Sequence, residues 1–160
     1  MYSKYIINNE KDTHILAERL ACLSKKGDII LIHGILGSGK SVFCRAFIRK
    51  ISSNPFEIIP SPTFTLVQTY ECTKLTISHF DLYRITHPDE IHELCLEEAF
   101  ENTISLIEWP NCLQDFIPKN RLDIYIKRDN IYEKRIFYLK PYGIDWEKRI
   151  LILNSKYNKN

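Results

Sequence analysis

The 160-residue sequence predicts a single three-layer α/β domain, in which helices cover both faces of a mostly parallel central sheet with antiparallel edge strands. Three observations support this class. Short apolar runs of strand length alternate with segments whose apolar residues recur at helical spacing. The length suits one domain spanning residues 1–160. The content of 44% apolar and 26% charged residues is that of an ordinary globular protein.

The first helix is expected to begin at Asp12 or Thr13, because either side chain can cap a helix N-terminus. Its apolar residues recur at helical spacing, and Gly27 supplies a stop signal. Residues 28–33 follow as an apolar run without alternation. This run predicts a central parallel strand that is buried on both faces.

The segment after this strand, Gly34–Ser41, fits the pattern G-x-x-x-x-G-K-[ST] without a mismatch. Glycines let successive backbone N–H groups point at one anion, and the helix expected at residues 42–51 adds the positive end of its dipole. Lys40 is expected to reach the β- and γ-phosphates of a nucleotide, and the Ser41 hydroxyl to bind Mg²⁺. The domain is therefore predicted to be of the P-loop NTPase type. The alternative is a loop that keeps this shape and has lost its ligand.

Two hydroxyl residues precede the next strand, which is expected to end near Tyr70. Pro62 favours an extended conformation at Ser61. Ser61 and Thr63 either face a phosphate or a metal-bound water, or bond the local backbone as Ser and Thr commonly do. The residues alone favour the second interpretation.

Two further strands are predicted to end in carboxylates. Residues 75–80 lead to Asp81, and residues 104–107 lead to Glu108. Open α/β sheets bind ligands at the carboxyl ends of their strands, and P-loop enzymes hold Mg²⁺ partly through an acidic residue at such a position. Both carboxylates are therefore candidates for binding the metal or ordering the attacking water. His79 is expected to be packed or hydrogen-bonded rather than catalytic.

The remaining segments complete the layers with an acidic helix, two edge strands and a closing helix. The acidic helix is interpreted as a solvated face, with a partner surface as the alternative. The expected bounds are 87–100 for the acidic helix, 122–128 and 134–141 for the edge strands with a turn around Asp129 and Asn130, 144–153 for the closing helix and 154–160 for a frayed polar tail.

Charge, cysteine content and hydropathy argue against a nucleic-acid surface, a disulfide or zinc framework, a signal peptide and a membrane span. The net charge is +2, and no Lys/Arg cluster longer than two indicates a nucleic-acid surface. The five cysteines are odd in number and lack a C-x-x-C pair, so neither a disulfide framework nor a zinc site is indicated and reduced thiols in a cytoplasm are expected. Residues 1–13 lack the apolar core of a signal peptide. No apolar run approaches the ~20 residues of a membrane span.

Four segments taken together resemble one family. They are Gly34–Ser41, Ser61-Pro62-Thr63-Phe64-Thr65-Leu66-Val67, His79-Phe80-Asp81-Leu82-Tyr83-Arg84 and Ile107-Glu108-Trp109-Pro110. Their order and spacing closely resemble TsaE, the bacterial ATPase family of tRNA threonylcarbamoyladenosine synthesis. The resemblance extends from Thr13 to Arg135 and is more specific than a generic P-loop.

The resemblance implies a small cytoplasmic P-loop domain that binds ATP and Mg²⁺ and hydrolyses ATP slowly to ADP. It implies TsaB- and TsaD-like partner proteins, which carry out the transfer to adenosine, and contact with tRNA only through that complex. Carried over by position, the resemblance implies the following roles. The phosphates would be held by Gly37, Ser38, Gly39, Lys40, Ser41 and Val42, and Mg²⁺ would be bound by Ser41 and Glu108. Hydrolysis would depend on Asp81 with Lys40, the base or ribose would lie near Thr13, and the nucleotide would also contact Arg135, in preference to Arg128.

The sequence departs from the family pattern at several positions. Ile35 replaces a usual Asp and cannot accept a hydrogen bond, so any contact of that Asp is in doubt. Ser41 replaces a usual Thr but keeps the hydroxyl. Ala46 and Cys95 stand where Gly is common. If Cys95 has a positive φ, its backbone carries strain of order 1 kcal/mol.

Rival functions use the same loop differently. A small-molecule kinase usually needs a lid that carries arginines, and Arg84, Arg121 and Arg128 are not paired in a lid-like segment. A non-hydrolysing adaptor would use bound nucleotide only to set its shape. A GTPase is disfavoured because the sequence lacks N-K-x-D.

Overall fold

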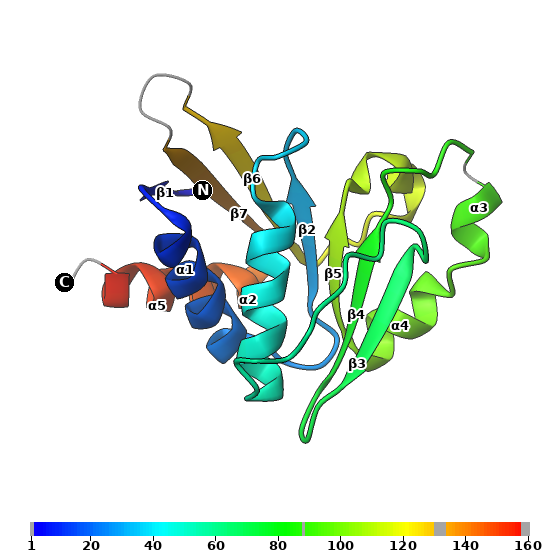
Figure 1. The fold of residues 1–160 in the computed structure, drawn as a ribbon, viewed down its shortest axis with the longest axis horizontal. Helices are drawn as coiled ribbons and strands as arrows, with labels where there is room; N and C mark the ends of the chain where they lie inside the picture. Colours follow the sequence, from blue (N-terminus) through cyan, green and yellow to red (C-terminus); the bar gives the residue numbers. More distant parts are fainter. Residues whose placement is uncertain (1, 88, 130–133, 158–160) are drawn as a thin grey trace.

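A computed structural model describes residues 2–87, 89–129 and 134–157, whose strands form one seven-stranded sheet in the order β1-β7-β6-β2-β5-β4-β3 (Figure 1). In chain order the elements are β1 (Ser3–Ile7), α1 (Glu10–Leu23), β2 (Ile29–His33), α2 (Lys40–Ser52), β3 (Val67–Glu71), β4 (Thr76–Asp81), α3 (Asp89–His92), α4 (Leu96–Asn102), β5 (Ile104–Glu108), the 3₁₀ helix η1 (Pro110–Phe116), β6 (Arg121–Arg128), β7 (Arg135–Tyr142) and α5 (Ile144–Tyr157).

The sheet is parallel at its centre and antiparallel toward its edges. Strands β6, β2, β5 and β4 run parallel to their neighbours in this central group. Strand β3 pairs antiparallel with β4, and β7 and β1 extend the other side as antiparallel strands. This arrangement confirms the predicted fold class.

Helices lie on both faces of the sheet. Along β2, Ile30 and Ile32 pack into one core cluster with α1, α2 and α5, whereas Ile29 and Leu31 pack into a second with α3, α4 and η1. Alternate residues of a strand point to opposite faces, so the two clusters are the two interfaces of a three-layer domain. Figure 1 shows α1 and α2 in front of the sheet, and α3 and α4 gathered beside β3, β4 and β5.

The structure contains a first strand, β1, that was not predicted from the sequence. Strand β1 pairs with β7, from Ser3 opposite Leu139 to Ile7 opposite Arg135. Its inward residues are buried and its outward residues exposed in strict alternation. As a result the hairpin β6–β7 does not form the sheet edge as expected, because β6 lies beside β2 and β7 is covered by β1. A strand of five residues with one half-polar face gives little local signal of its own.

The first helix begins earlier than expected. Asn9 is the N-cap, and its side chain accepts a hydrogen bond from the Asp12 N–H at 3.0 Å. The Asp12 carboxylate in turn accepts one from the Asn8 N–H at 2.9 Å. The expected cap at Asp12 or Thr13 is therefore wrong, and both residues lie inside the first turn. The reciprocal pair satisfies two backbone donors at the helix start.

The single helix expected at residues 87–100 is broken in two. Helix α3 ends at His92, and α4 begins at Leu96 after Cys95, which has φ of 50°. A left-handed residue cannot continue an α-helix, so the chain changes direction here. The positive φ considered for Cys95 from the sequence is confirmed.

The closing helix α5 extends beyond the expected end at Leu153 and reaches Tyr157. The Asn154 side chain donates a hydrogen bond to Ser3 Oγ at 2.8 Å and accepts one from the Tyr5 hydroxyl. Arg149 donates to Asp28 Oδ1 at 2.8 Å and to the Leu23 carbonyl at 3.0 Å. These contacts fasten α5 to both β1 and the start of β2.

Two expected features fall partly outside the described residues, namely Asn130 of the β6–β7 turn and residues 158–160 of the tail. Among the helices of the described ranges, none combines the length and the apolar character needed to cross a lipid bilayer.

Candidate functional site

The pattern G-x-x-x-x-G-K-[ST] forms the turn between β2 and α2, where close contacts at Gly34 and a positive φ at Gly39 favour glycine over other residues. A Cβ at Gly34 would lie 2.5 Å from Ser38 Oγ. Gly39 is the N-cap of α2 with φ of 107°, and a Cβ there would lie 3.2 Å from Arg135 Nε. The local sequence therefore fixes a tight loop that directs the N-terminus of a 13-residue helix, with its positive dipole end, toward the adjacent cavity.

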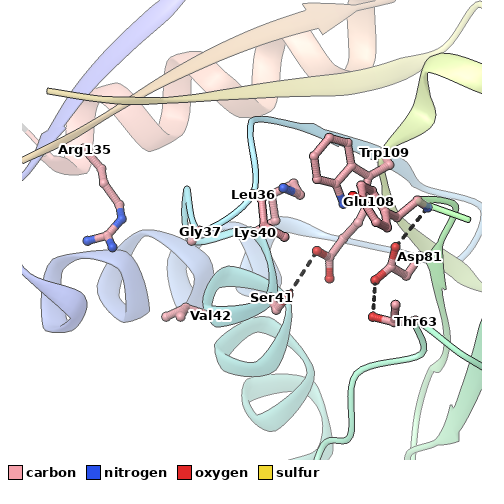
Figure 2. Close-up of a pocket in the computed structure, with 12 residues that line it drawn as sticks. Leu36, Gly37, Lys40, Ser41, Val42, Thr63, Asp81, Glu108, Trp109 and Arg135 are labelled. Atoms are coloured by element: carbon pink, nitrogen blue, oxygen red, sulfur yellow. Dashed lines mark hydrogen bonds between the residues drawn. The ribbon is translucent and has the colours of Figure 1, made fainter. Parts of the chain in front are cut away.

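A cavity of about 310 Å³ lies at this helix start, at the carboxyl ends of the central strands. Figure 2 shows side chains from the loop, from β4 and β5 and from β7 directed at it. Its lining residues are Leu36, Gly37, Gly39, Lys40, Ser41, Val42, Thr63, Asp81, Tyr83, Glu108, Trp109 and Arg135. Most of the positions expected from the sequence thus lie around one space.

Lys40 is held inside the loop. Its ammonium donates hydrogen bonds to the carbonyl oxygens of Gly34 at 2.8 Å and Ile35 at 3.0 Å. The same nitrogen lies 3.9 Å from the centre of the Trp109 ring, within range of a cation–π contact. Burial lowers the pKa of Lys40, and the carboxylates of Glu108 and Asp81 oppose this change. An anion in the cavity would favour the charged ammonium further.

Ser41 and Glu108 form a pair of oxygen ligands. The Ser41 hydroxyl donates to Glu108 Oε2 at 3.1 Å (Figure 2). Adjacent ligands of an octahedral Mg²⁺, each about 2.1 Å from the metal, lie about 3.0 Å apart. The observed oxygen separation therefore fits two neighbouring positions around Mg²⁺, and oxygen is the donor type that this ion prefers.

The other oxygen of Glu108 is held by a buried histidine. His79 Nε2 lies 2.9 Å from Glu108 Oε1, and both side chains are only 1% exposed. This agrees with the expectation that His79 is hydrogen-bonded. The Cys44 thiol approaches the same pair, with its sulfur within 4.8 Å of the two ligand atoms. Burial and the Glu108 charge raise the pKa of Cys44 well above its ordinary value, which keeps the thiol protonated and a poor metal ligand.

Asp81 ends β4 directly beside Glu108, with which it is paired in the parallel register. Its Oδ2 accepts the Thr63 hydroxyl at 2.7 Å, and its Oδ1 accepts the Tyr83 N–H at 3.1 Å. Ser61 lies 2.7 Å from Thr63 and completes a chain of hydroxyls that leads to the carboxylate. The interpretation favoured from the sequence, in which these hydroxyls bond local backbone, is therefore wrong. They orient Asp81.

Three further positions taken from the family pattern, two arginines and a threonine, differ in their placement. Arg135 reaches from β7 to the loop and donates to the Ser38 carbonyl at 2.9 Å. Arg128 is exposed and does not line the cavity. Thr13 is buried in α1 and is also not a lining residue. The Ser38 side chain is fully buried beneath the loop, where its hydroxyl has no partner among the described residues.

Two aromatic residues complete the cavity without having been singled out from the sequence. Trp109 follows β5 with φ of 57°, and its ring centre lies 4.8 Å from that of Tyr83. Both residues directly follow a strand-end motif, Tyr83 after Asp81-Leu82 and Trp109 after Glu108. The signal was therefore present in the motifs. What the sequence did not show is the left-handed turn that brings Trp109 over Lys40.

Comparisons with known proteins give one consistent result. Residues 7–136 match the family profile described as "Threonylcarbamoyl adenosine biosynthesis protein TsaE". A protein named tRNA threonylcarbamoyladenosine biosynthesis protein TsaE from Rickettsia felis is 42% identical over 122 residues, covering 76% of this chain and 71% of that protein. The protein of the same name from Bacillus subtilis is 34% identical over 131 residues, covering 81% and 80%. A crystal structure of Bacillus subtilis YdiB superposes with a TM-score of 0.81 at 26% identity, covering 99% of this chain and 97% of that one.

Proposed function

The chain belongs to the TsaE family, and on that premise we propose that it binds MgATP in the cavity beside Lys40 and hydrolyses it in support of tRNA threonylcarbamoyladenosine biosynthesis. The observation that carries the proposal is the pairing of Ser41 with Glu108 at 3.1 Å beside a phosphate-binding loop. This is the ligand arrangement that a nucleotide-bound Mg²⁺ requires.

Binding would use groups that already surround the cavity. The backbone of Gly37, Gly39 and the first turn of α2 would receive the phosphates, and the Lys40 ammonium would exchange its two carbonyl partners for phosphate oxygens. Arg135 is fixed against the Ser38 carbonyl, which leaves its remaining guanidinium nitrogens available to the nucleotide. Thr13 remains a proposed contact for the base or ribose.

Hydrolysis would depend on positioning. The bound Mg²⁺ would neutralise charge on the β- and γ-phosphates. Asp81 receives hydrogen bonds on both oxygens, from Thr63 and from the Tyr83 backbone, so its orientation is fixed while further lone pairs remain free. It is therefore suited to accept a hydrogen bond from a water molecule and aim it at the γ-phosphate. Glu108, held by His79 on one oxygen, would present its other oxygen to the metal.

The first prediction tests the binding step. Lys40→Ala removes a charge-assisted contact worth roughly 1.5–3 kcal/mol, so calorimetry should show MgATP affinity falling at least about tenfold. Lys50→Ala, which truncates an exposed lysine on the same helix, is the matched control and should leave the affinity unchanged. Circular dichroism of both variants establishes that the fold is intact. Equal affinity of Lys40→Ala and the unmodified chain would refute nucleotide binding at this loop.

The fate of the γ-phosphate in a single turnover by the unmodified chain distinguishes the rival functions. An ATPase releases free phosphate in a single turnover, a small-molecule kinase transfers it to an added metabolite, and an adaptor retains unhydrolysed ATP. We propose the first outcome, with slow turnover by the chain in isolation. We further propose that TsaB- and TsaD-like proteins are its partners in the cytoplasm and that they perform the transfer to adenosine.

A further inference from the structure

Among the described residues, no helix packs over one face of the half of the sheet formed by β1, β6 and β7. Strands β1, β6 and β7 pack one face against α1 and α5. The second core cluster, which α3, α4 and η1 cover on the other face, contains no residue from these three strands within the described part of the chain. Figure 1 shows α3 and α4 beside β3, β4 and β5, at the other edge of the sheet from β1, β6 and β7.

Tyrosines and lysines alternate on this uncovered side, where the strand register also places the pairs Ile6–Ile136 and Arg121–Tyr142. We call it the open face and define it by Lys4, Tyr125, Lys127, Tyr138, Lys140 and Tyr142. Strand register places them in rows across the sheet. Lys4 lies opposite Tyr138, and Tyr138 lies opposite Tyr125, so that a cation and two aromatic rings follow one another across three strands.

The aromatic rings of the open face lie at the surface of the sheet and are only partly buried. The tyrosines of β6 and β7 are partly exposed, while the three lysines are exposed. Tyr125 stacks on His33 of β2 with ring centres 4.3 Å apart and planes 14° from parallel, which extends the row to a fourth strand. Tyr2 adds a ring at the edge, 5.8 Å from that of Tyr138. The Arg121 guanidinium lies 3.6 Å from the centre of the Tyr142 ring and covers that ring. Tyr138 and Tyr2 are therefore the rings to which a flat ligand would stack.

The charge of the open face is positive. Lys127 lies 5.5 Å from the Tyr138 ring centre and Lys140 lies 4.9 Å from that of Tyr142, so cations alternate with rings. The carboxylate on this side of β6 is Asp123, which is 2% exposed and bound by Arg121 at 2.8 Å. Arg121 neutralises that charge, and the exposed lysines keep a net positive charge on the open face that attracts an anion.

We propose that the open face binds a single-stranded segment of RNA, whose bases stack on the tyrosines and whose phosphates contact the lysines. Single-stranded nucleic acid is bound by this combination of aromatic rings and a basic surface, because every base has a π-face and every linkage carries a negative charge. A protein partner would instead favour an apolar patch depleted of lysine. The inference goes beyond the nucleotide site, since it uses none of its residues. It predicts a direct contact with RNA, whereas the family resemblance implied contact with tRNA only through other proteins.

The electrostatic half of the proposal is tested with lysine variants of the full chain. The probe is a fluorescein-labelled, unstructured RNA of about 12 nucleotides, and its binding is followed by fluorescence anisotropy over a range of KCl concentrations. Log affinity falls linearly with log salt, and each contacted phosphate of a single strand contributes about 0.7 to the steepness of this fall. The triple variant Lys4→Gln, Lys127→Gln, Lys140→Gln should therefore make the fall less steep by about 2. The matched control is Lys11→Gln, Lys26→Gln, Lys148→Gln, which removes the same charge from exposed positions elsewhere. Equal slopes for the two triple variants would overturn the proposal.

The stacking half needs a second variant. Tyr138→Leu keeps an apolar side chain at the centre of the open face and removes the ring, so RNA affinity should fall by about fivefold or more. Inorganic polyphosphate, measured as a competitor, should bind Tyr138→Leu and the unmodified chain equally and bind the lysine triple variant more weakly. Unchanged RNA affinity of Tyr138→Leu would show that the surface attracts polyanions without stacking and would overturn the proposal. If Tyr138→Leu does not fold, Tyr138→Ile, which favours the strand conformation, takes its place.

Two further measurements separate this inference from others. MgATP affinity should be unchanged in all these variants, so a loss of RNA binding is independent of the proposed ATPase function. If the open-face variants instead lose binding of TsaB- or TsaD-like proteins and retain RNA affinity, the surface is a protein interface and the RNA proposal is wrong.

Discussion

Glu108 and Asp81 are neighbours in register, yet their surroundings differ. Glu108 ends β5, a strand buried at every position, and His79 and Ser41 hold its two oxygens. Asp81 ends β4 and is held by a hydroxyl and a backbone N–H from the segments on either side. A metal ligand benefits from rigid support, whereas a water-positioning group benefits from segments that adjust when nucleotide binds. The contacts therefore support Glu108 as the Mg²⁺ ligand and Asp81 as the residue for hydrolysis.

The second prediction separates these two roles. Glu108→Gln keeps the size of the side chain but removes its charge, so the Mg²⁺ concentration required for tight ATP binding should rise. Asp81→Asn should leave MgATP affinity nearly unchanged and slow single-turnover hydrolysis by about 10²-fold or more. The measurement is a Mg²⁺ titration of ATP affinity for both variants, followed by single-turnover phosphate release.

Each variant serves as the control for the other, because both remove one buried carboxylate charge at the end of a central strand. A metal defect in Asp81→Asn alone would reverse the assignment. Normal behaviour of both variants would make the carboxylates structural and support the adaptor function.

Residue identity alone was a good guide to part of the site. The loop pattern located Lys40 and Ser41, and the strand-end positions located Asp81 and Glu108, because parallel strands deliver their carboxyl ends to one edge. The role of Thr63 was not predicted, since its partner Asp81 lies 18 positions away and no local pattern reports that contact. The position of Trp109 over Lys40 depends on a backbone conformation that few residues other than glycine adopt.

At the scale of elements, the break between α3 and α4 concentrates strain in one exposed residue. Cys95 has φ of 50° and is the N-cap of α4 without a side-chain hydrogen bond to that helix. Left-handed conformations cost an ordinary residue roughly 1 kcal/mol, which a glycine does not incur. The left-handed conformation of Cys95 therefore lowers the stability of the folded protein, and no cap hydrogen bond from its side chain compensates for this cost.

The third prediction follows from this strain. Cys95→Gly should raise the free energy of unfolding by up to about 1 kcal/mol, because the strain relieved exceeds the added flexibility of the unfolded chain. Cys22→Gly, at an exposed position inside α1, should lower it by about 0.5–1 kcal/mol. Urea denaturation of the two variants measures both effects, and the opposite signs are the diagnostic result. A destabilised Cys95→Gly would show that the thiol contributes a contact larger than the strain.

The elements with strong local periodicity were predicted well, and those that depend on distant partners were not. Helices α1 and α2 and strands β2, β4 and β5 lie within a few residues of their expected bounds. Strand β1 was missed because its pairing with β7 is not encoded nearby. The broken helix was missed because Glu, Leu, Ala and Ile make up most of the acidic segment and favour a helix, while the backbone conformation of Cys95 interrupts it.

At the scale of the molecule, exposed apolar side chains gather around the mouth of the cavity beside Lys40. Leu36 is 77% exposed and Tyr83 is 55% exposed, and both line the cavity. Ile35 and Phe64, adjacent in sequence to the lining residues Leu36 and Thr63, are 66% and 83% exposed. Apolar side chains grouped around a site are typical of a surface that another protein covers. This arrangement supports the proposed assembly with TsaB- and TsaD-like proteins.

The fourth prediction concerns that assembly. ATP turnover by the isolated chain should be slow and should change when TsaB- and TsaD-like proteins are added. Leu36→Ser and Phe64→Ser should weaken the association measured by calorimetry, because each removes exposed apolar area that docking would bury. Phe56→Ser, at a 90% exposed position beyond the C-terminal end of α2, is the control and should have no effect. No association of the unmodified chain at micromolar concentration would refute the pathway role.

The pairing of β1 with β7 also has a consequence for how the chain reaches its native state. Ser3 of β1 pairs with Leu139 of β7, and the Asn154 side chain of α5 donates a hydrogen bond to Ser3. Strand β1 therefore has its partners more than a hundred residues later in the sequence. Loops of that length close slowly, and folding rates fall as sequence separation between contacting residues grows. During synthesis on the ribosome, the strands that carry the phosphate-binding loop and Glu108 emerge long before β7. The cavity beside Lys40 can thus begin to assemble from the central strands, whereas β1 can join the sheet only after β7 has been synthesised.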